Sequence, residues 1–122
     1  DKSRKFLSDI KKLWSEYNDG PFKNMVDKID TYEYNYKQKE NHNETIYFVH
    51  CREPEEIKKF VDHYKDKCKT LLIKRDNIDI PKNYSDENVY NFTYDYIIEN
   101  NGTISELIIK VENFIKKIKL DK

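Results

Sequence analysis

Several residue types are scarce or missing in this chain of 122 residues. It has no alanine, two glycines, three prolines, one methionine and two cysteines. Two glycines are too few for a glycine-rich phosphate-binding loop, and neither a His-Glu-x-x-His zinc motif nor a nucleophile elbow is present. No apolar run approaches the roughly 20 residues that cross a bilayer. The sequence therefore predicts no enzyme, no cofactor and no membrane insertion by this segment.

Neither sign of charge is in excess. The 23 Lys and Arg residues balance the 23 Asp and Glu residues, so the net charge is zero. The two signs alternate along the chain as on solvated helix faces, and the basic stripe that is typical of nucleic-acid binders is missing. We therefore predict a protein partner, whose identity the sequence does not give, and no nucleic-acid partner.

The length and the apolar content of 37 % fit one domain with one core, spanning 1–122. The sequence begins at Asp1 without an initiating Met, so we expect it to be a fragment of a longer protein. Lys, Asn, Ile and Tyr are abundant while Ala is missing. Because Ala is the best helix former, this bias indicates A+T-rich codon usage rather than a physical optimum.

Apolar residues recur at helical spacing in several segments. These segments are 6–17, 22–29, 57–72, 89–97 and 107–118. Pro21 and Pro54 are suited to the first turns of the second and third helices. Gly102 ends the fourth, and Thr103 with Glu106 forms a capping box for the last, so these two helices are expected to form an antiparallel hairpin. The prediction is an all-α fold, an antiparallel bundle of four to five helices, with Trp14 in its core.

The stretch 31–51 has two interpretations. Tyr32, Tyr34 and Tyr36 alternate with polar residues, and 45–49 is strand-like in composition, which indicates a small β-hairpin at 31–51. Alternatively, the second helix continues to about Lys39 and a short helix covers 44–51. Short apolar runs discriminate poorly between the two, and we favour the helical interpretation.

The two cysteines are predicted not to pair with each other. If the third helix is continuous from Pro54, Cys68 lies about 21 Å along it, whereas a disulfide needs Cα atoms within about 7 Å. Cys51 and Cys68 are therefore either reduced or paired outside this sequence. His63 lies five residues before Cys68, which is the wrong helical spacing for a shared ligand set, so no metal site is predicted.

The ten tyrosines are the most suggestive feature of the sequence. Tyrosine is enriched at protein interfaces because it offers a large contact area and a hydroxyl group at small entropic cost. Codon bias is the alternative explanation for their number. Six tyrosines do not fit the apolar stripes: Tyr32, Tyr34, Tyr36, Tyr47, Tyr90 and Tyr94. Of these, all except Tyr47 are candidate partner-binding residues, and Tyr90 and Tyr94, four apart, are expected to share one helix face.

The run from Glu56 to Leu72, EIKKFVDHYKDKCKTLL, resembles the "Phe…Tyr-x-x-x-Cys…Leu-Leu" helices of the PIR/VIR variant surface proteins of Plasmodium. The residue bias is also similar to that of malaria parasites. This resemblance implies a helical, non-enzymatic module, secreted or on the surface of an infected cell, that contacts host proteins or antibodies. It carries over no site residue. The alternatives are an intracellular helical adaptor or structural subunit with reduced cysteines, and a non-catalytic piece of a larger enzyme.

Overall fold

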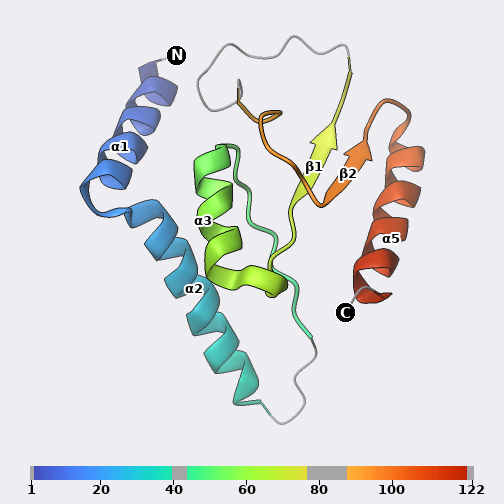
Figure 1. Ribbon diagram of the computed structural model, residues 1–122, viewed down its shortest axis with the longest axis horizontal. Helices are drawn as coiled ribbons and strands as arrows, with labels where there is room; N and C mark the ends of the chain where they lie inside the picture. The colour runs from blue at the N-terminus through green and yellow to red at the C-terminus, as the bar shows by residue number, and fades with distance from the viewer. Residues whose placement is uncertain (1, 40–43, 77–87, 121–122) are drawn as a thin grey trace. The chain divides into compact units, whose positions relative to one another are not determined.

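A computed structural model of the chain describes residues 2–39, 44–76 and 88–120 (Figure 1). The elements in chain order are α1 (Lys2–Asn18), α2 (Gly20–Lys37), α3 (Pro54–Tyr64), a 3₁₀ turn (Lys65–Lys67), β1 (Leu71–Lys74), β2 (Tyr96–Glu99) and α5 (Ile104–Leu120). The prediction of a mostly helical chain is confirmed. Where the sequence predicts one domain, the chain packs as two compact units, 1–50 and 51–122.

The first unit contains α1 and α2, which meet at a tight corner. Asp19 has a left-handed backbone with φ of 59°, and its N–H donates to the Ser15 carbonyl at 3.0 Å. Gly20 follows and is buried under the indole of Trp14, which occupies the space where a Cβ would stand. Glycine at this position therefore allows the indole to close over the corner.

The α2 helix continues through the three alternating tyrosines and ends at Lys37. A β-hairpin at 31–51 is therefore wrong, and the helical interpretation is confirmed as far as Lys37. The Glu33–Lys37 ion pair, at 3.6 Å and spaced i, i+4, supports the helix locally. A β-hairpin would instead need a second strand to pair with this segment. Residues 44–51 have no regular secondary structure, so the short helix expected there is also wrong.

In the second unit, α3 begins at Pro54 as predicted but ends at Tyr64 instead of continuing to Leu72. Lys65 has a positive φ of 50°, and the 3₁₀ turn that follows leads to an extended backbone at Cys68. Leu71 and Leu72 belong to β1. Their helical spacing is overridden because the apolar run finds a partner strand 25 residues further along the chain.

The strands β1 and β2 pair in parallel, with Leu71 opposite Tyr96 and Lys74 opposite Glu99. The helix predicted over 89–97 is therefore wrong: residues 88–92 form turns and bends, and Tyr96 and Ile97 lie in a strand. The predicted helical hairpin with the last helix is wrong for the same reason. The sequence also predicts Ser85 as the N-terminal cap of that helix, and this residue lies outside the described ranges.

A reciprocal link between Thr70 and Asp95 fixes the start of the strand pair. The Asp95 carboxylate accepts hydrogen bonds from the Thr70 N–H at 2.7 Å and from its hydroxyl at 2.9 Å. The Asp95 N–H donates back to the Thr70 hydroxyl at 2.9 Å. Thr70 is buried, so these bonds hold the register at a site with little access to water.

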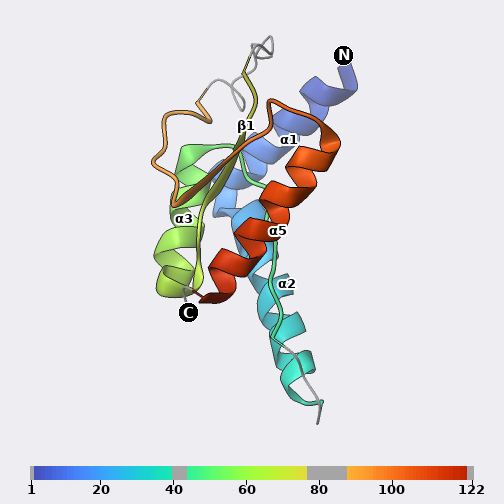
Figure 2. The same ribbon diagram turned by 90° about the vertical axis from the view of Figure 1, so that its right-hand side faces the viewer.

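The last helix, α5, begins at its predicted capping box. The Thr103 N–H and hydroxyl donate to the Glu106 carboxylate at 2.6 and 3.0 Å, and the Glu106 N–H donates to the Thr103 hydroxyl at 3.3 Å. The helix lies along one face of the strand pair (Figure 2). There the Tyr96 ring meets Phe114 edge-on at 5.3 Å between centroids, and Ile98 is buried.

Candidate protein-binding surfaces

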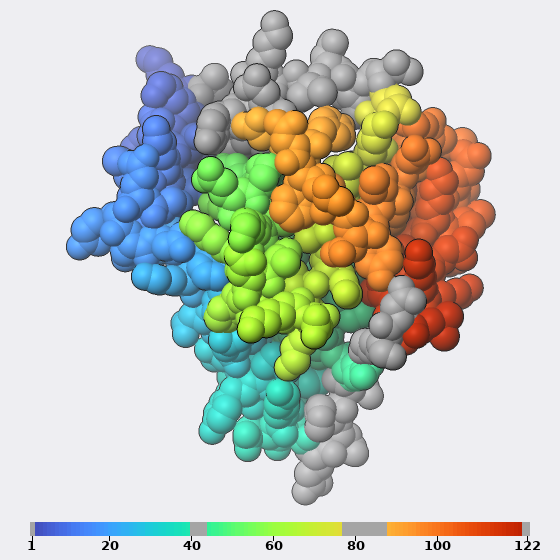
Figure 3. Space-filling view, in the orientation of Figure 1, coloured from blue at the N-terminus to red at the C-terminus, as the bar shows by residue number. Residues whose placement is uncertain are grey.

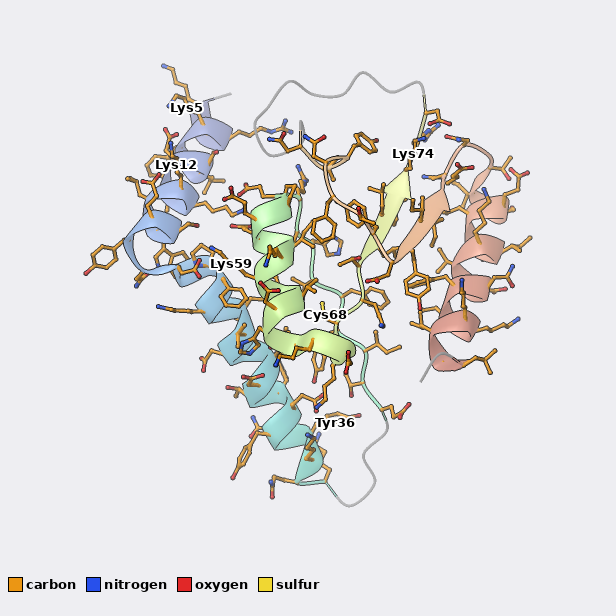
Figure 4. The ribbon with its side chains drawn as sticks, viewed as in Figure 1. Lys5, Lys12, Tyr36, Lys59, Cys68 and Lys74 are labelled. Carbon is orange, nitrogen blue, oxygen red and sulfur yellow. The ribbon has the colours of Figure 1, made fainter. Side chains whose placement is uncertain are left out.

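Three of the candidate tyrosines lie on α2, where the helix separates them. Tyr32 and Tyr36 are four residues apart and share a face, whereas Tyr34 lies on another side of the helix. Tyr32 and Tyr34 are exposed, and Tyr36 lies near the end of α2 (Figure 4). The ammonium of Lys39 is 5.1 Å from the centre of the Tyr36 ring, close enough for a cation–π contact.

Tyr47 lies near Tyr32 and Tyr36 and forms a hydrogen bond with Glu33. The pKa of Tyr47 is raised, first by loss of water around its hydroxyl, then by its hydrogen bond to the Glu33 carboxylate and by the neighbouring Glu33, Tyr36 and Tyr32. We call Tyr32, Tyr36, Tyr47 and Glu33 the tyrosine cluster. The sequence analysis left Tyr47 out of the candidates. No local sequence pattern places Tyr47 beside α2, because the contact with Glu33 forms only in the folded chain.

Tyr90 and Tyr94 do not share a helix face, because no helix forms over 88–99. The Tyr94 hydroxyl donates to the Val89 carbonyl at 2.7 Å, and its ring packs edge-on against Phe92 at 5.1 Å. Burial raises the pKa of Tyr94, with smaller contributions from Cys51 and Tyr90. Tyr94 therefore closes a local loop, while Tyr90 stays exposed. In the space-filling view, the orange residues 88–99 lie between α3 and α5 (Figure 3).

One side of α1 is an exposed apolar surface of the first unit. At 100° per residue its apolar side chains fall within a sector of roughly 120°. They are Phe6, Leu7, Ile10, Leu13, Trp14 and Tyr17, which we call the α1 face. Their exposed fractions range from 43 % for Trp14 to 86 % for Tyr17, so Trp14 is not the core residue that the sequence predicts.

The polar side of α1 carries ion pairs between side chains that are four residues apart. Lys5 and Asp9 are 2.7 Å apart, and Lys12 and Glu16 are 3.9 Å apart, each pair at i, i+4 spacing. Lys5 and Lys12 lie on this solvated side (Figure 4). Exposed pairs of this kind contribute roughly 0.3–0.5 kcal/mol each. The helix is therefore supported locally, and its apolar side remains available for contact.

Neither cysteine forms a disulfide within the described residues, and each is partly buried. Cys51 donates to the Glu56 carboxylate at 3.5 Å. Burial, and secondly the charge of Asp95, raises the pKa of Cys68, which lowers its thiolate fraction and its reactivity at neutral pH. The helix expected to separate the two thiols ends at Tyr64, so the geometric argument for their separation is wrong as stated. In the structure the two thiols are nevertheless not joined to each other.

Within 2–39, 44–76 and 88–120, no three His, Cys, Asp or Glu residues are grouped so as to hold a metal ion. No helix in these ranges is long and apolar enough to span a membrane. No family model, no curated protein and no solved structure matches the chain. The surfaces are therefore interpreted from their own chemistry.

Proposed function

We propose that this chain is a non-enzymatic protein-interaction module. The observation that carries the proposal is the α1 face, a contiguous row of large apolar side chains that are all exposed. Contiguous exposed apolar surface marks association sites in soluble proteins. Full burial of one such side chain is worth about 1.5–3 kcal/mol, so a partner that covers several of them can offset the cost of association.

The tyrosine cluster supplies a second, more polar contact region of the first unit. Tyr32 is 66 % exposed, and the Glu33 carboxylate beside it accepts the Tyr47 hydroxyl and pairs with Lys37. A tyrosine ring offers a large contact area and a hydroxyl group at small entropic cost. Tyr32 and Tyr36 are therefore the candidate tyrosines that the geometry favours as anchors.

The resemblance to the PIR/VIR proteins supports a host protein or an antibody as the partner, and the outside of a parasite-infected cell as the place of contact. The alternative, an intracellular adaptor, is supported by the two cysteines, which form no disulfide within the described residues. Titration of the natural protein with a thiol reagent under denaturing, non-reducing conditions separates the two. Two reactive thiols from Cys51 and Cys68 favour the adaptor, whereas none favours the surface protein, with each cysteine paired outside this sequence.

A second candidate function, a non-catalytic piece of a larger enzyme, is favoured by the parallel strand pair. Purely parallel sheets occur almost only in α/β proteins, where helices cover both faces. A two-stranded sheet is marginally stable by itself. On this hypothesis the isolated chain unfolds without a sharp transition, while the natural protein unfolds cooperatively.

The test of the interaction module compares two glutamate substitutions on α1. Leu13→Glu places a charge on the α1 face, at a side chain that is 65 % exposed. Ser8→Glu places the same charge on the solvated side. Because both positions are exposed, each should change the free energy of unfolding by under about 0.5 kcal/mol.

Native size-exclusion chromatography of the natural protein in extracts of its own cells is the measurement. We expect the wild type and Ser8→Glu to elute as a complex. For Leu13→Glu, we expect the amount of protein in that complex to fall at least tenfold. If Leu13→Glu elutes with the wild type, the α1 face is not the binding surface.

A further inference from the structure

One edge of the β1 backbone has no partner strand among the described residues. The Thr70 carbonyl accepts from the Tyr96 N–H at 3.0 Å, and the Lys74 carbonyl accepts from the Asn100 N–H at 2.7 Å. Successive residues of a strand direct their N–H and C=O groups to opposite edges. Leu71 and Ile73 therefore direct theirs away from β2. In the described part of the chain the sheet has two strands, β1 and β2.

The outer edge of β2 is different, because α5 covers part of it. By the same alternation, Ile97 and Glu99 direct their backbone groups away from β1. The ammonium of Lys110 donates to the Glu99 carbonyl at 2.6 Å. A lysine at a strand edge hinders the addition of another strand. The described residues place no such side chain on the carbonyls of Leu71 or Ile73, so β1 is the open edge.

One face of the strand pair is apolar, and the other carries both apolar and charged side chains. The face toward α5 carries Leu71, Ile73, Tyr96 and Ile98, and the other carries Leu72 and Ile97 beside Lys74 and Glu99. Ile73 is 56 % exposed and Ile97 is 58 % exposed. Each face therefore carries an exposed isoleucine, and apolar side chains on both faces are typical of strands in parallel sheets that are covered on both sides.

We propose that the open edge of β1 binds a parallel, apolar β-strand of a partner polypeptide. The strand bonds to the outward N–H and C=O groups of Leu71 and Ile73 and covers the Ile73 side chain. Backbone groups in a row specify a strand as the occupant, since a helix has its own backbone groups already paired. The existing pair is parallel, and parallel strands prefer purely parallel sheets. This inference rests on the proposed function, that the chain binds another protein.

The test uses the full chain, labelled with ¹⁵N, and a synthetic heptapeptide Tyr-Asp-Tyr-Ile-Ile-Glu-Asn. This peptide reproduces residues 94–100, which already pair in parallel with β1 at its other edge. Amide hydrogen exchange is followed by NMR as the peptide is added. We expect exchange at Leu71 and Ile73 to slow at least tenfold, and exchange at Leu72, whose N–H faces β2, to stay unchanged.

Two proline variants form a matched pair. Ile73→Pro removes an outward N–H of β1, and Ile97→Pro removes an outward N–H of β2; neither removes a bond between the strands. We expect Ile73→Pro to abolish the protection of Leu71 and Ile97→Pro to keep it. If Ile73→Pro does not fold, Ile73→Lys retains the N–H and sets a charge beside the incoming strand, with the same expected loss.

The inference is overturned if saturating peptide leaves Leu71 and Ile73 unprotected, or if Ile73→Pro binds like the wild type. It is also overturned if these amides become protected at rising protein concentration without peptide, because the occupant is then a second copy of the chain. If the peptide does not protect the amides of Leu71 and Ile73 while Leu13→Glu still reduces the native complex, the strand-addition proposal is wrong. The proposal of an interaction module then still holds.

Discussion

At the scale of single residues, a few side chains decide the local geometry of each unit. Gly20 lets the Trp14 indole close over the corner between the first two helices. Thr70 and Asp95 fix where the parallel strands begin. No sequence motif reveals these roles, because each depends on a neighbour that only the folded structure supplies.

Thr70→Val tests the link at the start of the strands. Valine keeps the shape of threonine but loses the hydroxyl, which donates to the Asp95 carboxylate and accepts from the Asp95 N–H. Loss of both bonds at this buried position should lower the free energy of unfolding by about 1–3 kcal/mol.

Urea titration followed by circular dichroism measures this loss, and Thr45→Val, at an exposed position, is the control. Equal stability of the two variants would show that the Thr70–Asp95 link contributes nothing to the fold.

At the scale of elements, helices with local signals form where the sequence predicts them, and α5 is the clearest. The hydrogen bonds from the Thr103 N–H and hydroxyl hold the pKa of Glu106 below its usual range. A carboxylate with a lowered pKa in the folded state stabilises that state above its unfolded pKa. The stabilisation is lost as the pH falls through the folded pKa.

Glu106→Gln should therefore make the stability of the chain less dependent on pH in the acid range. The wild type is expected to lose stability as the pH falls below about 4.5, the ordinary pKa of a glutamate. The variant is expected to lose less stability over the same pH range. The measurement is the urea midpoint of unfolding at pH 6 and at pH 3. Glu112→Gln, on the same helix and outside the capping box, should lose as much as the wild type. A variant at position 106 that follows the wild-type curve would contradict the role of the box.

At the scale of the whole molecule, the chain is helical with a small parallel sheet. Far-UV circular dichroism should show a helical content well above the average of about a third for globular proteins, because four helices of 11 to 18 residues cover most of the described ranges. A spectrum dominated by strand would contradict this architecture.

The sequence by itself determined the helices whose backbone hydrogen bonds form within one short segment. Neighbours within four residues are sufficient to predict the start of α2 next to Pro21, the start of α3 at Pro54 and the capping box at Thr103. The i to i+4 bonds of a helix need no distant partner, so periodicity and caps are sufficient evidence.

Only the tertiary structure decided the strands and the surfaces. Leu71 and Leu72 have helical spacing, yet they become a strand because Tyr96 and Ile97 pair with them from 25 residues away. The tyrosine cluster likewise needs Tyr47 to return to Glu33. Such contacts depend on closing a loop and on burial that no local window contains. For this reason the sequence named Tyr32 and Tyr36 as candidates but could reveal neither the open edge of β1 nor the exposure of the α1 face.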